Sequence, residues 1–180
     1  MAGMMYVPRV GKSVRPEMRT LAVEGRAGYE CRYVEFAVGK DLAGKEYIKA
    51  YLLVPYGETE FPAVLMLHDH GARFDIGKEK LVKPMASVLE NGSEDHIMRS
   101  SRQWIDKNFD GVYFADSLAA SGYVVLVTDA LYWGERSSEE AHRWSELTYG
   151  SAYQYTHESD RMLDAKSRKS EIKSLKKSVY

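Results

Sequence analysis

The chain has little cysteine, no long apolar stretch and almost no net charge. Cys31 is the only cysteine among 180 residues, which excludes an intrachain disulfide and a cysteine-based zinc site. No run approaches the 18 apolar residues that a membrane-spanning helix needs. The net charge of −1 lacks the strong basic excess that marks nucleic-acid binding. We therefore expect neither a nucleic-acid partner nor a membrane partner.

The composition is that of a folded globular protein, with 44% hydrophobic and 28% charged residues. Residues 1–10 contain neither the apolar stretch nor the cleavage site of a secretory signal, so we expect a cytoplasmic protein. We divide the sequence into an N-terminal arm over residues 1–30, a folded region over 31–137 and a polar helical segment over 138–180. The last segment is interpreted as an insertion or a lid.

Hydrophobic patterning predicts an α/β protein. The first two expected strands are rich in β-branched and aromatic residues and flank a turn-rich link, which predicts an antiparallel pair. The other two are apolar throughout, as is typical of parallel strands covered on both faces. The strands are expected over residues 31–38, 46–54, 63–68 and 123–128. Helices are expected over 78–90, 111–121 (with Asp110 as N-cap), 138–147 and 158–178, and a polar loop is expected at 94–96.

Two polar segments follow the two apolar strands. His68-Asp69-His70-Gly71 ends the strand at 63–68, and the segment from Asp129 to Arg136 follows the next strand. Ligands of open parallel sheets bind at the carboxyl ends of the strands. Backbone N–H groups after such a strand can hold a developing oxyanion, and a glycine there lets a substrate approach closely.

These segments carry a family resemblance. The sequences PAVLMLHDHGA, GKEK and FADSLAASGYVVLVTDALYWGER together resemble the N-terminal half of an α/β-hydrolase, in particular dienelactone-hydrolase-like and acetyl-xylan-esterase-like bacterial esterases. The resemblance spans about residues 31–137. It implies a partial α/β-hydrolase fold, with a mostly parallel sheet, an antiparallel N-terminal strand pair and helices on both faces.

The resemblance also implies a function. It points to a serine esterase that acts on carboxylic esters, with acetylated carbohydrate as a candidate substrate, and that needs no cofactor. The backbone of His70 or Gly71 would supply one oxyanion donor.

The sequence departs from this family at the nucleophile. The elbow G-x-S-x-G is absent, because no serine lies two residues after one glycine and two before another. The catalytic acid and base that follow the elbow have no counterparts either. We therefore expect the N-terminal portion of a hydrolase that is inactive as this chain. A non-catalytic hydrolase-derived module, which binds a partner or a second copy through an exposed sheet edge, is the alternative.

A metal-dependent hydrolase is a further alternative. His68 and His70 are two residues apart in an extended segment, so their imidazoles share one face, and Asp129 could add a carboxylate ligand. The structural interpretation assigns His68 to a hydrogen bond within the loop and His70 to the shape of the oxyanion turn. We favour the structural interpretation and expect no metal.

Three further residues surround the expected site. Asp129 is expected to organise its loop by pairing with Arg136. Arg73 is a candidate ligand for an acidic substrate group, with an exposed salt bridge as the alternative. Trp133 is a candidate sugar-stacking residue, with a core or lid position as the alternative.

Overall fold

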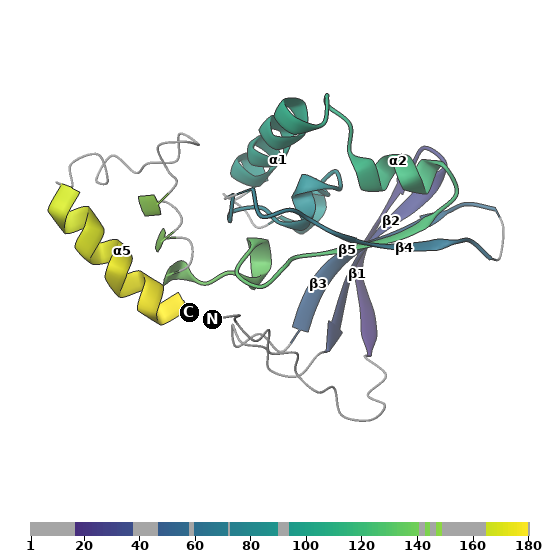
Figure 1. The fold of residues 1–180 in the computed structure, drawn as a ribbon. Helices are drawn as coiled ribbons and strands as arrows, with labels where there is room; N and C mark the ends of the chain where they lie inside the picture. The colour runs from purple at the N-terminus through teal and green to yellow at the C-terminus, as the bar shows by residue number, and fades with distance from the viewer. Residues whose placement is uncertain are drawn as a thin grey trace, which may run out of the picture.

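The fold is a five-stranded sheet with short helices, shown in Figure 1 as a computed structural model. The structure describes residues 17–37, 47–57, 60–71, 73–89, 94–140, 143–144, 147–148 and 165–179. The strands are β1 (Met18–Arg26), β2 (Tyr29–Ala37), β3 (Tyr47–Pro55), β4 (Ala63–Leu67) and β5 (Val124–Thr128). The helices are η1 (Lys78–Lys80), η2 (Ala86–Val88), α1 (Glu94–Asn108), α2 (Phe114–Ala120), η3 (Gly134–Arg136) and α5 (Ala165–Val179).

The expected mostly parallel sheet with helices on both faces is wrong. The strand order is β1-β2-β3-β5-β4, and three of its four pairings are antiparallel: β1 with β2, β2 with β3, and β3 with β5. Only β4 and β5 run parallel. Residues 18–26, which were assigned to the N-terminal arm, add an antiparallel strand. The sequence argument went wrong because the apolar content of a strand does not report the direction of its neighbours.

One face of the sheet carries the main core. Every second residue of β2, β3 and β5 points to this face, as the two-residue period of a strand requires. There Cys31, Tyr51 and Val127 are buried against Ala115 and Ala119 of α2. Figure 1 shows α1 and α2 on the same side of the sheet. Small alanine side chains let α2 lie close to the strands.

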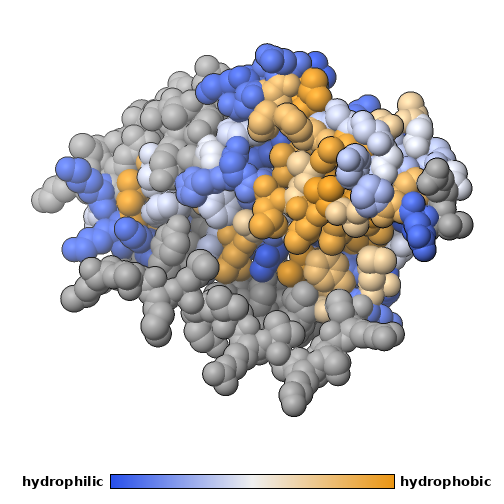
Figure 2. Space-filling view, turned by 45° about the vertical axis from the view of Figure 1, so that its right-hand side comes forward, coloured by the Kyte–Doolittle hydropathy of each residue, from blue (hydrophilic) through white to orange (hydrophobic). Residues whose placement is uncertain are grey.

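The opposite face stays partly uncovered at one edge. β4 is the last strand of the sheet, and its Leu65 and Leu67 are 63% and 70% exposed. Figure 2 shows a broad hydrophobic area on one side of the molecule. The expectation that the run at 63–68 is covered on both faces is therefore wrong for the described residues.

Three helix expectations also need correction. The helix expected over 78–90 is replaced by the two short 3-10 helices η1 and η2. The polar loop expected at 94–96 is instead the start of α1. Asp110 has a positive φ of 50° and lies before the N-cap of α2, which is Tyr113. Pro84 lies between η1 and η2 and cannot donate the backbone hydrogen bond that a continuous helix over 78–90 would need.

Candidate functional site

The parallel pairing of β4 and β5 brings the two polar segments together. Leu67 and Thr128 are register partners at the carboxyl ends of these strands. His68 and Asp129, which follow them, therefore lie on neighbouring chains at one edge of the sheet. This is the one relationship between strands that the site requires, and the structure provides it although the rest of the sheet is antiparallel.

Asp129 is a buried carboxylate surrounded by donors. Its Oδ1 accepts the backbone N–H of Lys78 at 2.7 Å. Its Oδ2 accepts the side-chain ammonium of Lys78 at 2.8 Å and the backbone N–H of Glu135 at 3.2 Å. The side chain is 1% exposed. Asp129 thereby ties the start of η1 to the start of η3.

Two glycines make room for this carboxylate. A Cβ at Gly77 or at Gly134 would collide with the Asp129 side chain, and Gly134 also has a φ of +50°. Arg136, the expected partner of Asp129, donates to its backbone oxygen at 3.0 Å rather than to its carboxylate. The carboxylate of Asp129 thus binds Lys78, and Arg136 contacts only the backbone of Asp129 in the contacts described.

Lys78 is the centre of a buried ionic network. Its Nζ lies 2.8 Å from Asp129, 2.6 Å from Glu135 and 3.0 Å from Glu79. Burial alone would lower the pKa of Lys78, but these carboxylates outweigh it and hold the pKa well above its ordinary value.

Glu135 extends the network to the sheet. Burial favours a higher pKa for Glu135, but attraction to Lys78 and hydrogen bonds from Lys78, Tyr33 and Lys49 lower it to about 2. Tyr33 donates its hydroxyl to Glu135, and Lys49 contacts the same carboxylate at 2.9 Å. Because Glu135 has partners on β2 and β3 as well as Lys78, the network fixes the turn after β5 against these two strands.

His68 is held as a neutral imidazole. Its Nε2 accepts the backbone N–H of Ala130 at 2.9 Å, so the proton resides on Nδ1, which donates to the backbone oxygen of Asp69 at 2.8 Å. Burial lowers the pKa of His68, which favours the same neutral form. His68 thus joins the ends of β4 and β5.

The loop after His68 is fixed by Lys80. The Nζ of Lys80 donates to the backbone oxygens of Asp69 at 3.2 Å and of His70 at 3.1 Å. Trp133 donates its Nε1–H to the same His70 oxygen at 3.1 Å. Lys80 and Trp133 therefore hold the backbone carbonyls of this loop in place.

Gly71 is required at its position for two reasons. Its φ is +47°, a conformation that residues with a Cβ rarely adopt. A Cβ there would also collide with the indole of Trp104. Trp104 comes from α1 and is 6% exposed, so this helix forms the wall behind the loop.

Arg73 and Trp133 lie beside this loop. Arg73 is 6% exposed, with its Nε 3.6 Å from Asp75 and its Nη2 donating to Gln103 at 3.2 Å. The exposed salt bridge considered for it is a buried one. Trp133 stacks on Phe74 at 4.3 Å between ring centroids, so Phe74 covers one face of its indole.

Sequence reasoning missed Lys78, Lys80 and Trp104. The segment GKEK contributed only to the resemblance. Lysines are seldom buried, and the spacing of Lys78 and Lys80 does not predict that both are. Their burial follows from the short η1 helix, which turns both side chains toward the strand ends. The sequence predicted a regular helix over 78–90, and that prediction did not place these two lysines in the interior.

Asp75, His96 and Ser100 form a further cluster that the sequence did not single out. His96 Nε2 lies 3.2 Å from Asp75 Oδ2, and Ser100 donates its hydroxyl to the same oxygen. The carboxylate is thus central, whereas a catalytic triad places the histidine between the serine and the acid. Ser100 is also fully buried. The cluster fastens α1 to the segment before η1.

The metal alternative has no support from the described geometry. Within the residues that the structure describes, no group of three histidine, cysteine, aspartate or glutamate side chains is arranged to hold a metal ion. Of the three expected ligands, Asp129 already binds Lys78, and His68 Nε2 already accepts the Ala130 N–H.

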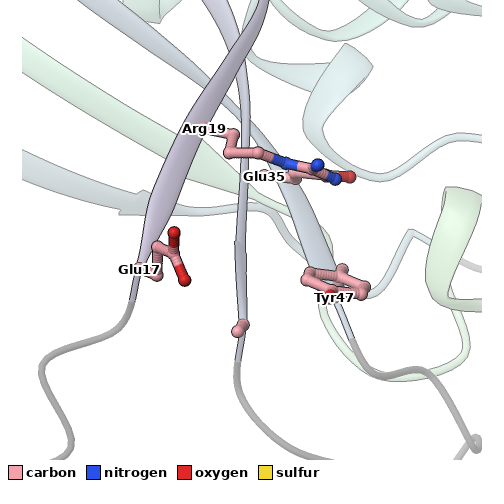
Figure 3. A pocket seen from close by; sticks show the side chains of 5 residues that line it. Glu17, Arg19, Glu35 and Tyr47 are labelled. Atoms are coloured by element: carbon pink, nitrogen blue, oxygen red, sulfur yellow. The ribbon is translucent and has the colours of Figure 1, made fainter.

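A small cavity lies elsewhere on the sheet. It has a volume of about 100 Å³ and is lined by side chains of β1, β2 and β3 and by Glu17. Figure 3 shows Arg19 reaching across β2 to Glu35, with Tyr47 beside them. Arg19 already pairs with Glu35 and is 65% exposed, so its charge is not reserved for a ligand. Its lining residues are Glu17, Arg19, Glu35, Ala37 and Tyr47.

None of the helices in the described part of the chain is both long enough and apolar enough to cross a bilayer.

No protein-family model, curated protein or solved structure gives a significant match to this sequence or fold.

Proposed function

We propose that this chain carries the oxyanion-binding part of an ester-hydrolysing site, as the N-terminal portion of a serine esterase. One observation carries the proposal: the His70–Gly71 backbone lies at the carboxyl end of the parallel strand β4, in a loop whose carbonyls are held by Lys80 and Trp133. In acyl transfer, backbone N–H donors at such a position stabilise the negative oxygen that forms when the carbonyl is attacked.

The position of the loop supports the same proposal. It lies at the carboxyl end of one of the two parallel strands, next to the segment that follows the other. Lys80, Trp104 and Trp133 hold it from behind. Donors that are fixed before the reaction do not need to reorganise when charge develops, which is why rigid loops suit this role.

The nucleophile, the acid and the base are not supplied by this sequence. In the complete reaction a serine would attack the ester carbonyl, and a histidine would take its proton. We therefore expect p-nitrophenyl acetate to show no serine-inhibitor-sensitive turnover with this chain. Such turnover would contradict the assignment of the chain as a portion of an esterase.

Anion binding tests the oxyanion role directly. We would titrate the ¹⁵N-labelled chain with benzenesulfonate, whose tetrahedral anionic group mimics the intermediate, and with neutral benzenesulfonamide as a control of matched shape. The amide resonances of His70 and Gly71 are expected to move with the sulfonate and not with the sulfonamide. Equal shifts with both compounds, or shifts confined to other residues, would refute the role.

A second candidate function is a binding or oligomerisation module. It rests on the contrast between the two sheet edges. β1 carries Arg19, Glu24 and Arg26 and has a register shift after Thr20, features that hinder edge-to-edge pairing. β4 reads AVLML, without charge or proline, and exposes Leu65 and Leu67. Light scattering over a concentration series separates the two candidates, because a monomer at all concentrations contradicts self-association.

We further propose a cytoplasmic location and a small-molecule ester as the partner of the complete protein. The single cysteine supports the location, because a chain without an intrachain disulfide is usual in reducing compartments. The acetylated-carbohydrate variant of the substrate rests on the resemblance and on Trp133 beside the loop.

A further inference from the structure

We propose that α5 is the docking surface for an acidic helix of a partner protein. The surface is a lysine stripe, which consists of Lys169, Lys173 and Lys176 on α5. The proposal goes beyond the esterase function and is independent of it, because α5 lies outside the edge formed by β4 and β5.

The stripe follows from the spacing of its lysines. They are three and four residues apart, so a helix with 3.6 residues per turn places them on one side, one above another. All three side chains are exposed. The sequence has further lysines in the same helical register, at positions 166 and 177.

The charge of α5 is separated from that of the remaining chain. α5 contains six lysine or arginine residues and one glutamate, a net charge of +5, so the remaining residues carry −6 of the total of −1. The single acid, Glu171, pairs with Arg143 at 2.9 Å. Among the contacts between described residues, none engages the lysine stripe.

The stripe is unfavourable for the helix by itself. Like charges three or four residues apart on a helix repel one another and weaken it. The helix dipole favours basic residues only in the last turn, which accounts for Lys176 but not for Lys169 or Lys173. A partner that brings negative charge removes this repulsion, so the arrangement favours a polyanionic ligand.

The chemistry of α5 favours an acidic protein helix among the polyanions. Nucleic acid and anionic bilayers extend beyond one helix, so they would also meet the negative charge of the remaining chain. α5 has no aromatic side chain to stack on bases. Its Ile172 and Leu175, which a helix on a membrane surface would insert into the lipid, are partly buried.

An acidic helix also matches the geometry of the stripe. Carboxylates at three- and four-residue intervals lie roughly 5 Å apart along a helix axis, as the lysines do. Two helices side by side can therefore pair each carboxylate with one ammonium. Figure 1 shows α5 apart from the sheet, α1 and α2, so none of these elements covers it.

The test measures binding of the full chain to a fluorescein-labelled helical peptide that carries glutamate at three- and four-residue intervals. The same peptide with glutamine in place of glutamate is the matched control. We expect fluorescence anisotropy to show binding of the glutamate peptide that weakens as the salt concentration rises. Absence of binding, or equal binding of the glutamine peptide, would overturn the proposal.

Neutral substitutions test the stripe itself. Lys169→Gln combined with Lys173→Gln and Lys176→Gln is expected to weaken binding of the glutamate peptide about tenfold or more. All three positions are exposed, so the fold is expected to persist, which circular dichroism checks.

The control variant removes the same charge elsewhere. Lys83→Gln, Arg99→Gln and Lys107→Gln together replace three exposed basic residues outside α5. This variant is expected to bind the glutamate peptide as the wild type does. An equal loss in both triple variants would show that net charge, and not the stripe, attracts the peptide.

A charge-neutral exchange separates position from charge. Lys173→Ser with Ser174→Lys keeps the composition of α5 and moves one lysine about 100° around the helix. We expect weaker binding of the glutamate peptide, and unchanged binding would contradict the stripe. Duplex DNA and vesicles of phosphatidylserine with phosphatidylcholine are titrated at the same salt concentration. Tighter binding of either than of the glutamate peptide would overturn the assignment to an acidic helix.

Discussion

Asp129 accepts both the backbone N–H and the side-chain ammonium of Lys78, on its two carboxylate oxygens. The two residues come from the turns that follow neighbouring parallel strands, 51 positions apart in sequence. This double contact joins η1 to the carboxyl end of β5. It also places Lys80, two residues after Lys78, beneath the loop that follows β4.

Loss of the Asp129 charge is expected to destabilise the protein. Asp129→Asn keeps the size of the side chain but leaves the buried ammonium of Lys78 with less compensating charge. Breaking a buried pair in this way costs roughly 3–5 kcal/mol, which urea unfolding measures. The control is Arg102→Ala, which removes an exposed ion pair with Asp106 and should cost at most about 1 kcal/mol. Similar losses in both variants would contradict the network.

Replacing Gly71 is expected to cost more unfolding free energy than replacing Gly28, because only a Cβ at Gly71 meets another side chain. Gly71→Ala introduces a Cβ at a positive φ and against Trp104. Gly28→Ala introduces one at a φ of +88° with no atom within 4 Å. The strained backbone costs about 1–2 kcal/mol at either site, and Gly71→Ala should cost more by the clash. Equal unfolding free energies would show that Trp104 does not pack on the loop.

Part of the loss of stability in acid is expected to come from protonation of Glu135. Its pKa is lowered from 4.5 to about 2 by the fold. A carboxyl with a depressed pKa stabilises the folded state above its unfolded pKa, and this contribution is lost as the pH falls toward the folded pKa. The difference in unfolding free energy between wild type and Glu135→Gln should therefore shrink between about pH 5 and pH 2. A constant difference over this range would mean that Glu135 is not paired with Lys78.

The β4 edge offers a test of the second candidate function. If β4 mediates self-association, Leu65→Lys with Leu67→Lys should abolish any concentration-dependent rise in scattering, because charge at a sheet edge hinders pairing. The matched control is Val23→Lys on β1, a residue that is 54% exposed. A scattering increase that persists in the β4 variant, or that the β1 variant removes equally, would contradict a β4 interface.

The strands and two of their pairings were accessible from the sequence, namely the antiparallel pair β2–β3 and the parallel pair β4–β5. The four expected strands correspond to β2, β3, β4 and β5 within two residues at each end, because alternation and β-branched residues are local signals. β1 was missed because MRTLAVEGR mixes charged and apolar residues on an exposed edge. The antiparallel pairing of β3 with β5 was also missed, because which strands become neighbours is not contained in a local pattern.

The site was accessible only in part. His68, His70, Gly71 and Asp129 could be placed at one edge because each follows an apolar strand. The lysines beneath them could not, because an irregular segment with two 3-10 turns has no periodicity to reveal which side chains it buries. The pairing of Asp129 with Lys78 instead of Arg136 is a consequence of that segment.

The most direct test of the account is a crystal structure of this chain with benzenesulfonate. The account predicts a sulfonate oxygen within hydrogen-bonding distance of the backbone N–H groups of His70 and Gly71, with Lys80 bound to the carbonyls on the other side of the loop. A sulfonate bound at any other place, or a Lys80 that does not contact the Asp69 and His70 oxygens, would contradict it.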